Sequence, residues 1–164
     1  MKALLIALVA TSLALPALAA TYKIPEDDPI VTVVIPDKGW EATNIARGIE
    51  VSDEDDEVYL AIEGIDVDNI EAVVKAAVDY LDRQGVSIDA STSKESEGTL
   101  NGFHVNDLGW KGKDQDGDVV VHLTIVSVAK ERGVLFTYWA SPDGDKKHDA
   151  TITAMVKSLK KVGN

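Results

Sequence analysis

The amino-acid sequence predicts an α+β domain in which an antiparallel β-sheet has a helix on each face, as a three-layer α/β/α sandwich. Apolar residues recur at helical spacing along residues 68–84 and 149–161. Between these helices lie short segments in which apolar residues recur at every second position, the period of a β-strand. In residues 119–128 and 134–141, both faces of the predicted strand are largely apolar. Because each apolar face must be covered, we expect the two helices on opposite sides of the sheet.

The first 20 residues are typical of a signal peptide. Lys2 is the only charged residue among them, residues 3–15 form an apolar run, and small residues precede position 21. The run is shorter than the roughly 20 apolar residues of a spanning helix. We therefore expect cleavage after Ala19 or Ala20, export to the periplasm, and no membrane anchor.

The rest of the chain has the size of one domain. Residues 21–29 contain two prolines and no apolar periodicity, which indicates an extended N-terminal lead-in, and residues 30–164 form the predicted domain. The chain has no cysteine, which excludes thiol nucleophiles, thiolate metal sites and a lipid-bearing cysteine. The formal net charge is -12, and it becomes -13 when Lys2 is removed with the signal peptide. An acidic chain repels phosphate backbones, so we expect no nucleic-acid partner.

The order of the elements predicts consecutive pairing of the later strands. Short polar turns with glycine separate those strands, which favours an antiparallel meander. Asp68 and Asp149 are expected to cap the two helices. The predicted elements are strands 30–35, 48–52 and 57–64, helix 68–84, strands 88–97, 103–113, 119–128 and 134–141, and helix 149–161.

Two segments carry a family resemblance. They are residues 33–40, with the sequence VVIPDKGW, and residues 134–139, with the sequence VLFTYW, set between the two helices in the order above. Together these features resemble the Mog1/PsbP-like fold, including the small periplasmic DcrB-type proteins. The resemblance implies a non-enzymatic binding or accessory role, but it transfers no binding residue. DcrB-type members tend to be lipoproteins, and this chain departs from them because it has no cysteine to lipidate.

Aromatic and imidazole side chains are the weak candidates for a contact site. Of the three tryptophans, Trp40, Trp110 and Trp139, we favour Trp110 as a partly exposed contact residue because glycine and lysine residues flank it; packing in the core is the alternative for each. His104 and His122 lie on strands that we expect to be neighbours. Whether they converge depends on the strand register.

Two acidic segments have some features of cation sites. Residues 114–118 resemble the start of a calcium loop, but Ile125 stands where such a loop needs a bidentate glutamate, and a hairpin turn is expected there. Residues 53–57 are interpreted as the solvated tip of a hairpin. We assign no metal ligand and no cofactor, and a calcium-dependent structural module remains an alternative.

The leading hypothesis is an exported, soluble, non-catalytic binding or accessory protein. Its partner would be a protein or an envelope component, bound at a sheet edge, a loop or a groove between helix and sheet. The sequence contains no catalytic motif. The alternative from another class is a small periplasmic hydrolase or metal-dependent enzyme that uses His104 or His122 with acids on adjacent strands. The sequence leaves the oligomeric state open.

Overall fold

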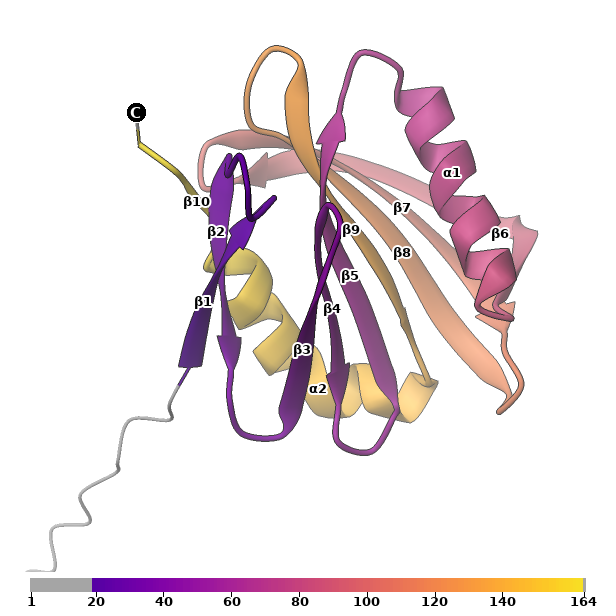
Figure 1. Ribbon diagram of the computed structural model, residues 1–164. Helices are drawn as coiled ribbons and strands as arrows, with labels where there is room; N and C mark the ends of the chain where they lie inside the picture. The colour runs from indigo at the N-terminus through magenta and orange to yellow at the C-terminus, as the bar shows by residue number, and fades with distance from the viewer. Residues whose placement is uncertain (1–18, 164) are drawn as a thin grey trace, which may run out of the picture.

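The computed structural model describes residues 19–163, and this part of the chain forms two antiparallel sheets and two α-helices (Figure 1). One sheet has seven strands in the order β3-β4-β5-β9-β8-β7-β6, and the other has three in the order β1-β2-β10. The strands are β1 (Ala19–Ile24), β2 (Val31–Pro36), β3 (Trp40–Ile45), β4 (Gly48–Asp53), β5 (Val58–Asp66), β6 (Ser87–Leu100), β7 (Phe103–Lys113), β8 (Asp118–Ser127), β9 (Arg132–Ala140) and β10 (Lys160–Lys161). The helices are α1 (Ile70–Arg83) and α2 (Pro142–Lys157). The predicted α+β class is confirmed.

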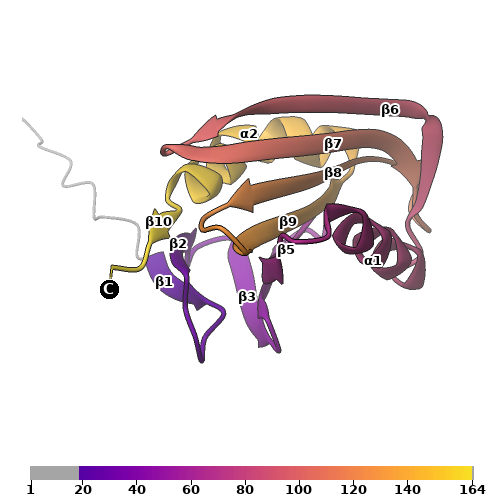
Figure 2. The same ribbon diagram turned by 90° about the horizontal axis from the view of Figure 1, so that it is seen from above.

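The larger sheet contains the predicted meander. Strands β6 to β9 pair consecutively and antiparallel, and β4 pairs with β5 across the acidic turn, as the sequence predicts. Strand β5 then pairs with β9, so that α1 carries the chain from the middle of the sheet to its far edge at β6. Figure 2 shows this strongly twisted sheet from above, with α1 and α2 against different parts of it.

Alternate residues of β8 pack with different helices. Val121 and Leu123 belong to the hydrophobic cluster that includes Leu81 of α1. Val126 belongs to a second cluster, which includes Met155 of α2. The two apolar faces predicted for this strand are therefore both used in the core.

The three-stranded sheet is a feature that the predicted single sheet lacks. The predicted first strand forms β2, which pairs with β1 and β10 and not with the larger sheet. Val31, Val33 and Ile24 of this small sheet are fully buried in the cluster that contains α2. This side of the core is thus shared between α2 and the small sheet, which the predicted sandwich of one sheet and two helices does not include.

The N-terminal segment belongs to the folded part of the chain. Residues 21–29 are predicted as an extended lead-in, and within them β1 continues to Ile24. Ala19 and Ala20, at the end of the predicted signal peptide, pair with Pro36 and Ile35. The other residues of the predicted signal peptide lie outside the described residues. No helix within residues 19–163 has the length and hydrophobicity needed to cross a bilayer.

Both helices begin at positions other than the predicted ones. Asn69, not Asp68, caps α1, because its side chain accepts a hydrogen bond from the amide of Ala72. The cap of α2 is Ser141, not Asp149, so this helix starts two turns earlier than predicted. Pro142 follows Ser141 directly, and proline is favoured in the first turn of a helix because it has no amide hydrogen to leave unpaired.

Candidate functional site

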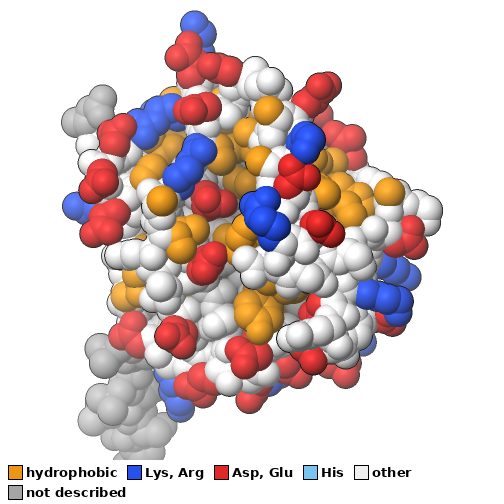
Figure 3. Space-filling view, turned by 45° about the vertical axis from the view of Figure 1, so that its right-hand side comes forward, with side chains coloured by type: hydrophobic (Ala, Val, Ile, Leu, Met, Phe, Trp, Pro, Cys, Tyr) orange, Lys and Arg blue, Asp and Glu red, His pale blue; other side chains and the backbone are white. Residues whose placement is uncertain are grey.

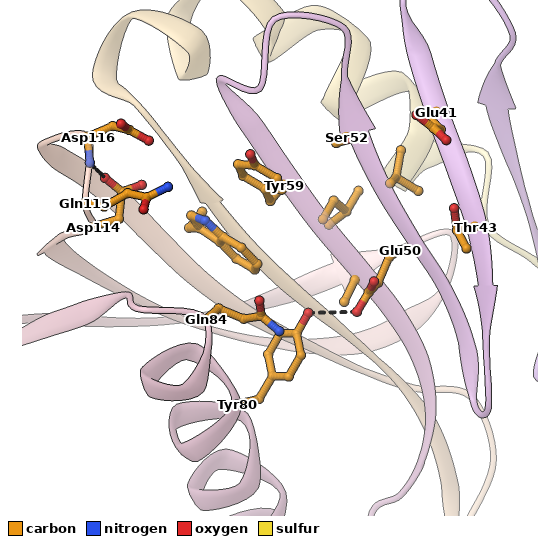
Figure 4. Close-up of a pocket in the computed structure, with 14 residues that line it drawn as sticks. Glu41, Thr43, Glu50, Ser52, Tyr59, Tyr80, Gln84, Asp114, Gln115 and Asp116 are labelled. Carbon is orange, nitrogen blue, oxygen red and sulfur yellow. Dashed lines mark hydrogen bonds between the residues drawn. The ribbon is translucent and has the colours of Figure 1, made fainter.

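A cleft of about 400 Å³ opens between the C-terminal end of α1, the β7–β8 turn and strands β3 and β4 (Figure 4). Tyr59 and Trp139 line it from the neighbouring strands β5 and β9, where they are paired in register. Their rings are stacked, with centroids 5.0 Å apart and planes 13° from parallel. Trp139 is only 8% exposed, so Tyr59 presents most of the aromatic surface.

Acidic side chains surround this aromatic pair. Glu41 and Glu50 come from β3 and β4, Asp114 and Asp116 come from the β7–β8 turn, and the residues that line the cleft include no lysine, arginine or histidine. Figure 4 shows Tyr59 between the turn on one side and the two glutamates on the other. Four carboxylates without a basic neighbour in the lining make the cleft a region of negative potential.

A hydrogen bond joins α1 to the acidic wall. The Tyr80 hydroxyl donates to Oε1 of Glu50 at 2.9 Å. The rings of Tyr80 and Trp139 pack edge to face, with their centroids 6.2 Å apart. Burial raises the pKa of Tyr80 well above its ordinary value, and the Glu50 carboxylate raises it further. The hydroxyl therefore remains a donor, and the second oxygen of Glu50 accepts no hydrogen bond from the described residues.

The β7–β8 turn holds its two acids in different ways. Oδ1 of Asp114 accepts hydrogen bonds from the amides of Asp116 and Gly117, at 2.9 and 3.0 Å. Asp118, which a calcium loop would use as a ligand, pairs with Lys113 at 2.6 Å. These contacts are typical of a hairpin turn. They leave the Asp116 carboxylate without a hydrogen bond within the described residues.

Acidic side chains are spread over the wider surface around α1. Figure 3 shows them on this face of the molecule, interspersed with lysine and arginine side chains and with exposed hydrophobic side chains. Burial raises the pKa of Tyr59, and the carboxylates of Asp56, Asp116 and Asp53 raise it further. Carboxylates of the β4–β5 turn and of the β7–β8 turn thus both contribute to the negative potential at Tyr59, at the base of the cleft.

The structure does not bring His104 and His122 together. Val105, next to His104, packs with the α2 cluster, whereas Leu108 packs with the α1 cluster. Since residues alternate along β7, His104 lies on the α1 side, where it is exposed. His122 is opposite Gly109 in the sheet register and lies on the α2 side. The two imidazoles therefore cannot share a ligand.

His122 forms a polar cluster with Asp107 instead. Its Nδ1 is 3.0 Å from Oδ2 of Asp107, and the Thr124 hydroxyl donates to the other oxygen of that carboxylate at 2.5 Å. The hydrogen bond to Asp107 raises the pKa of His122. Burial alone would raise the pKa of Asp107, but the hydrogen bonds from His122 and Thr124 bring it below its ordinary value. Within the described residues no serine or threonine hydroxyl bonds to the His122 ring, so no nucleophile is paired with this histidine.

Trp110 and His148 lie outside the acidic cleft. Trp110 is partly buried against the α1 cluster and lines a depression of about 770 Å³ beside the edge strand β6, which Asp107 and His122 also line. His148, in α2, contacts Trp40 and Asp53. Neither residue lines the acidic cleft, whose tryptophan is Trp139.

Comparison with solved structures identifies the fold. The protein resembles the cyanobacterial PsbP (CyanoP) of Synechocystis sp. PCC 6803, with a TM-score of 0.60 over 94% of this chain and 99% of that chain, at 10% identity. The protein has a Mog1/PsbP-like fold. It is also similar to LpqN, a protein involved in cell envelope biogenesis in Mycobacterium tuberculosis, with a TM-score of 0.58, 14% identity, and coverage of 88% of this chain and 92% of that chain. No family model matches the sequence, and a comparison with curated proteins finds no match.

The cleft cannot be predicted from the sequence, because the residues that line it are scattered from Glu41 to Trp139. Only the β5–β9 pairing and the docking of α1 bring them together. One signal was present in the sequence: Tyr59 and Trp139 are aromatic residues on strands with two apolar faces. The sequence favours Trp110 among the three tryptophans, because local context does not show which aromatic ring borders a cleft.

Proposed function

We propose that this PsbP-like protein is an exported, non-catalytic binding or accessory protein whose acidic cleft holds a positively charged side chain of a protein partner. The observation that supports this proposal is the composition of the cleft, in which four carboxylates surround a stacked tyrosine and tryptophan and no basic side chain is present. We propose that the fold around the cleft has three layers, with α1 on one face of the larger sheet and with α2 and the small sheet on the other face.

Arginine is the side chain that fits this chemistry best. Its planar guanidinium stacks on aromatic rings and pairs with carboxylates through two parallel hydrogen bonds. The partly exposed ring of Tyr59 offers the stacking surface, while Glu50 and Asp116 stand on opposite sides of it (Figure 4). A volume of about 400 Å³ is at the lower end of ligand pockets, which suits one or two side chains of a partner and not a large cofactor.

Calorimetry with a short arginine-containing peptide, blocked at both ends, tests this function. The matched ligand is the same peptide with citrulline, which keeps the shape of arginine and removes its charge. We expect Glu50→Gln to weaken binding of the arginine peptide by about fivefold, the effect of losing one partly exposed charge pair of about 1 kcal/mol.

Glu71→Gln is the control variant, because Glu71 is exposed in the first turn of α1 and does not line the cleft. It changes the net charge by the same amount as Glu50→Gln. The proposal fails if the citrulline peptide binds as tightly as the arginine peptide, or if the two variants weaken binding equally.

Export to the periplasm is part of the same proposal. The motivating features are the apolar run at residues 3–15 and the small residues before position 21. Intact-mass measurement of the protein from a periplasmic extract should show a chain that starts at Ala20 or Thr21. A full-length chain confined to the cytoplasm would contradict this part of the proposal.

A further inference from the structure

Three potential metal ligands meet where the β4–β5 turn packs against α2, outside the acidic cleft. They are Asp53, Glu57 and His148, and their ligand atoms all lie within 4.8 Å of one another. The cluster contains both nitrogen and oxygen donors. It shares no residue with the lining of the cleft, so it is independent of the proposed function.

The imidazole of His148 has a buried nitrogen. Its Nε2 is inaccessible to solvent and, within residues 19–163, has no hydrogen-bond partner. The side chain as a whole is 16% exposed, and the nearest acidic atom is Oδ2 of Asp53 at 3.3 Å. Buried polar atoms in folded proteins are nearly always paired, so an orphaned ring nitrogen beside a carboxylate requires an explanation.

Hydrogen bonds to one oxygen hold the Asp53 carboxylate in place and leave its other oxygen for a second partner. Its side chain is only 1% exposed. Oδ1 accepts hydrogen bonds from the amides of Glu57 and Val58, at 2.8 and 2.7 Å. From the described residues, Oδ2 receives only a long contact from the amide of Asp55, at 3.4 Å, and it faces His148. Backbone hydrogen bonds to one oxygen of a carboxylate are the kind of support that orients metal ligands in proteins.

The spacing of the His148 and Asp53 donor atoms matches two ligands of a tetrahedral metal ion. With zinc–nitrogen and zinc–oxygen bonds of about 2.0 to 2.2 Å, two ligand atoms of a tetrahedron lie about 3.3 to 3.5 Å apart. The 3.3 Å between Nε2 of His148 and Oδ2 of Asp53 falls in this range. We propose that Asp53, Glu57 and His148 form a zinc site with a fourth position open to water.

The ammonium group of Lys147 competes with a metal ion for the Glu57 carboxylate. Its Nζ lies 2.8 Å from Oε2 of Glu57 and 2.6 Å from Oδ2 of Asp55. Zinc binding requires Glu57 to turn one oxygen from the ammonium group to the metal, while Asp55 retains Lys147. Removing the ammonium charge therefore favours zinc, and Lys147→Gln binds the metal more tightly than the original protein.

Zinc chloride titrated by calorimetry into protein freed of metal by chelation and dialysis tests the site. We expect binding of about one zinc ion per chain. His148→Gln and Glu57→Gln each weaken it by at least about tenfold, whereas Lys147→Gln strengthens it by a few fold. His104→Gln and His122→Gln are matched controls, because each removes an imidazole from outside the cluster. Both should bind zinc as the original protein does.

Two further readouts separate this site from general attraction of cations. Calcium should bind far more weakly than zinc, because calcium prefers oxygen ligands and gains nothing from the imidazole. The ring of Trp40 lies 5.1 Å from that of His148, so paramagnetic Co²⁺ should quench Trp40 fluorescence in the original protein and not in His148→Gln. Absence of stoichiometric zinc binding, equal affinity in His148→Gln, or equal affinity for calcium would each overturn the proposal.

Discussion

Asp53 shows how a single acid in an acidic run acquires a structural role. It begins the run of five acids at positions 53–57, which the sequence predicts as a solvated hairpin tip. In the structure, Asp53 is buried, because the tight turn directs the amides of Glu57 and Val58 inward and they need an acceptor. Sequence pattern predicted the turn correctly, but identical neighbouring side chains do not reveal which of them turns inward.

Replacement of this carboxylate should be costly. Asp53→Ala leaves two backbone amides without their acceptor, and we expect the free energy of unfolding to fall by about 2 to 4 kcal/mol. Urea denaturation in the presence of EDTA measures this loss without any contribution from bound metal. Asp55→Ala is the control, since that side chain is 66% exposed and should cost less than about 1 kcal/mol. Equal losses in the two variants would show that burial of Asp53 contributes nothing.

The contact between His122 and Asp107 should make the free energy of unfolding depend on pH. Its hydrogen bond to Asp107 raises its pKa in the folded state, with a further contribution from Asp145 of α2. Asp149 of α2 and Tyr138 of β9 line the same small cavity. A raised pKa means that protonated His122 stabilises the fold fully below its unfolded pKa, about 6.5, and that this stabilisation is lost as the pH rises through the folded pKa.

The comparison of the original protein with His122→Gln isolates this effect, because the other two histidines are common to both. Between about pH 6 and pH 8, the free energy of unfolding of the original protein should decrease more steeply than that of the variant. Chemical denaturation at several pH values measures both slopes. Parallel curves would mean that the contact with Asp107 does not favour the protonated imidazole.

At the scale of elements, periodicity predicts the helices and the meander well but places their ends less well. Helix α2 starts at Pro142, although the sequence prediction starts it at Asp149. The apolar pattern is clear only from Ile152 onward, whereas the first two turns are polar and are determined by the Ser141 cap. Apolar patterns locate the buried part of a helix, and capping residues locate its beginning.

Helix α1 should control the cleft through its packing. Leu81 is fully buried against the larger sheet, next to Tyr80, which lines the cleft. We expect Leu81→Ala to lower the free energy of unfolding by about 3 kcal/mol, because it leaves a cavity under the helix. Looser docking of α1 should also weaken binding of the arginine peptide.

Asp82→Ala provides the control in the same helix turn, since Asp82 is exposed. It should change stability by less than about 0.5 kcal/mol and leave peptide binding intact. Thermal melts and peptide calorimetry on both variants measure the two effects. If Leu81→Ala lost stability but bound the peptide normally, the position of α1 would not matter to the cleft.

At the scale of the whole molecule, the small sheet and the cleft are what the sequence does not reveal. Residues 30–35 have the composition of a strand, but nothing local shows that they pair with β1 and β10 and not with the larger sheet. The cleft depends on contacts between residues about a hundred positions apart in the chain. Both features follow from tertiary packing, which overrides local preference.

The overall acidity predicts a salt dependence of binding. The chain carries a net charge of -12, and the lining of the cleft is acidic. Affinity for the arginine peptide should fall by about tenfold between about 0.05 M and 0.5 M sodium chloride, because screening shortens the reach of exposed charges. The citrulline peptide should show little change over this range. Salt-independent binding of the arginine peptide would mean that charge does not drive the interaction.

Mapping by nuclear magnetic resonance shows where the arginine peptide binds, and so tests whether the acidic cleft is the binding surface. The arginine peptide is titrated into isotope-labelled protein and the shifts of amide and indole signals are followed. We expect the largest shifts on residues that line the cleft: Tyr59, Tyr80, Gln84, Asp116 and the indole of Trp139. Shifts concentrated on another surface, or spread evenly over the acidic exterior, would contradict it.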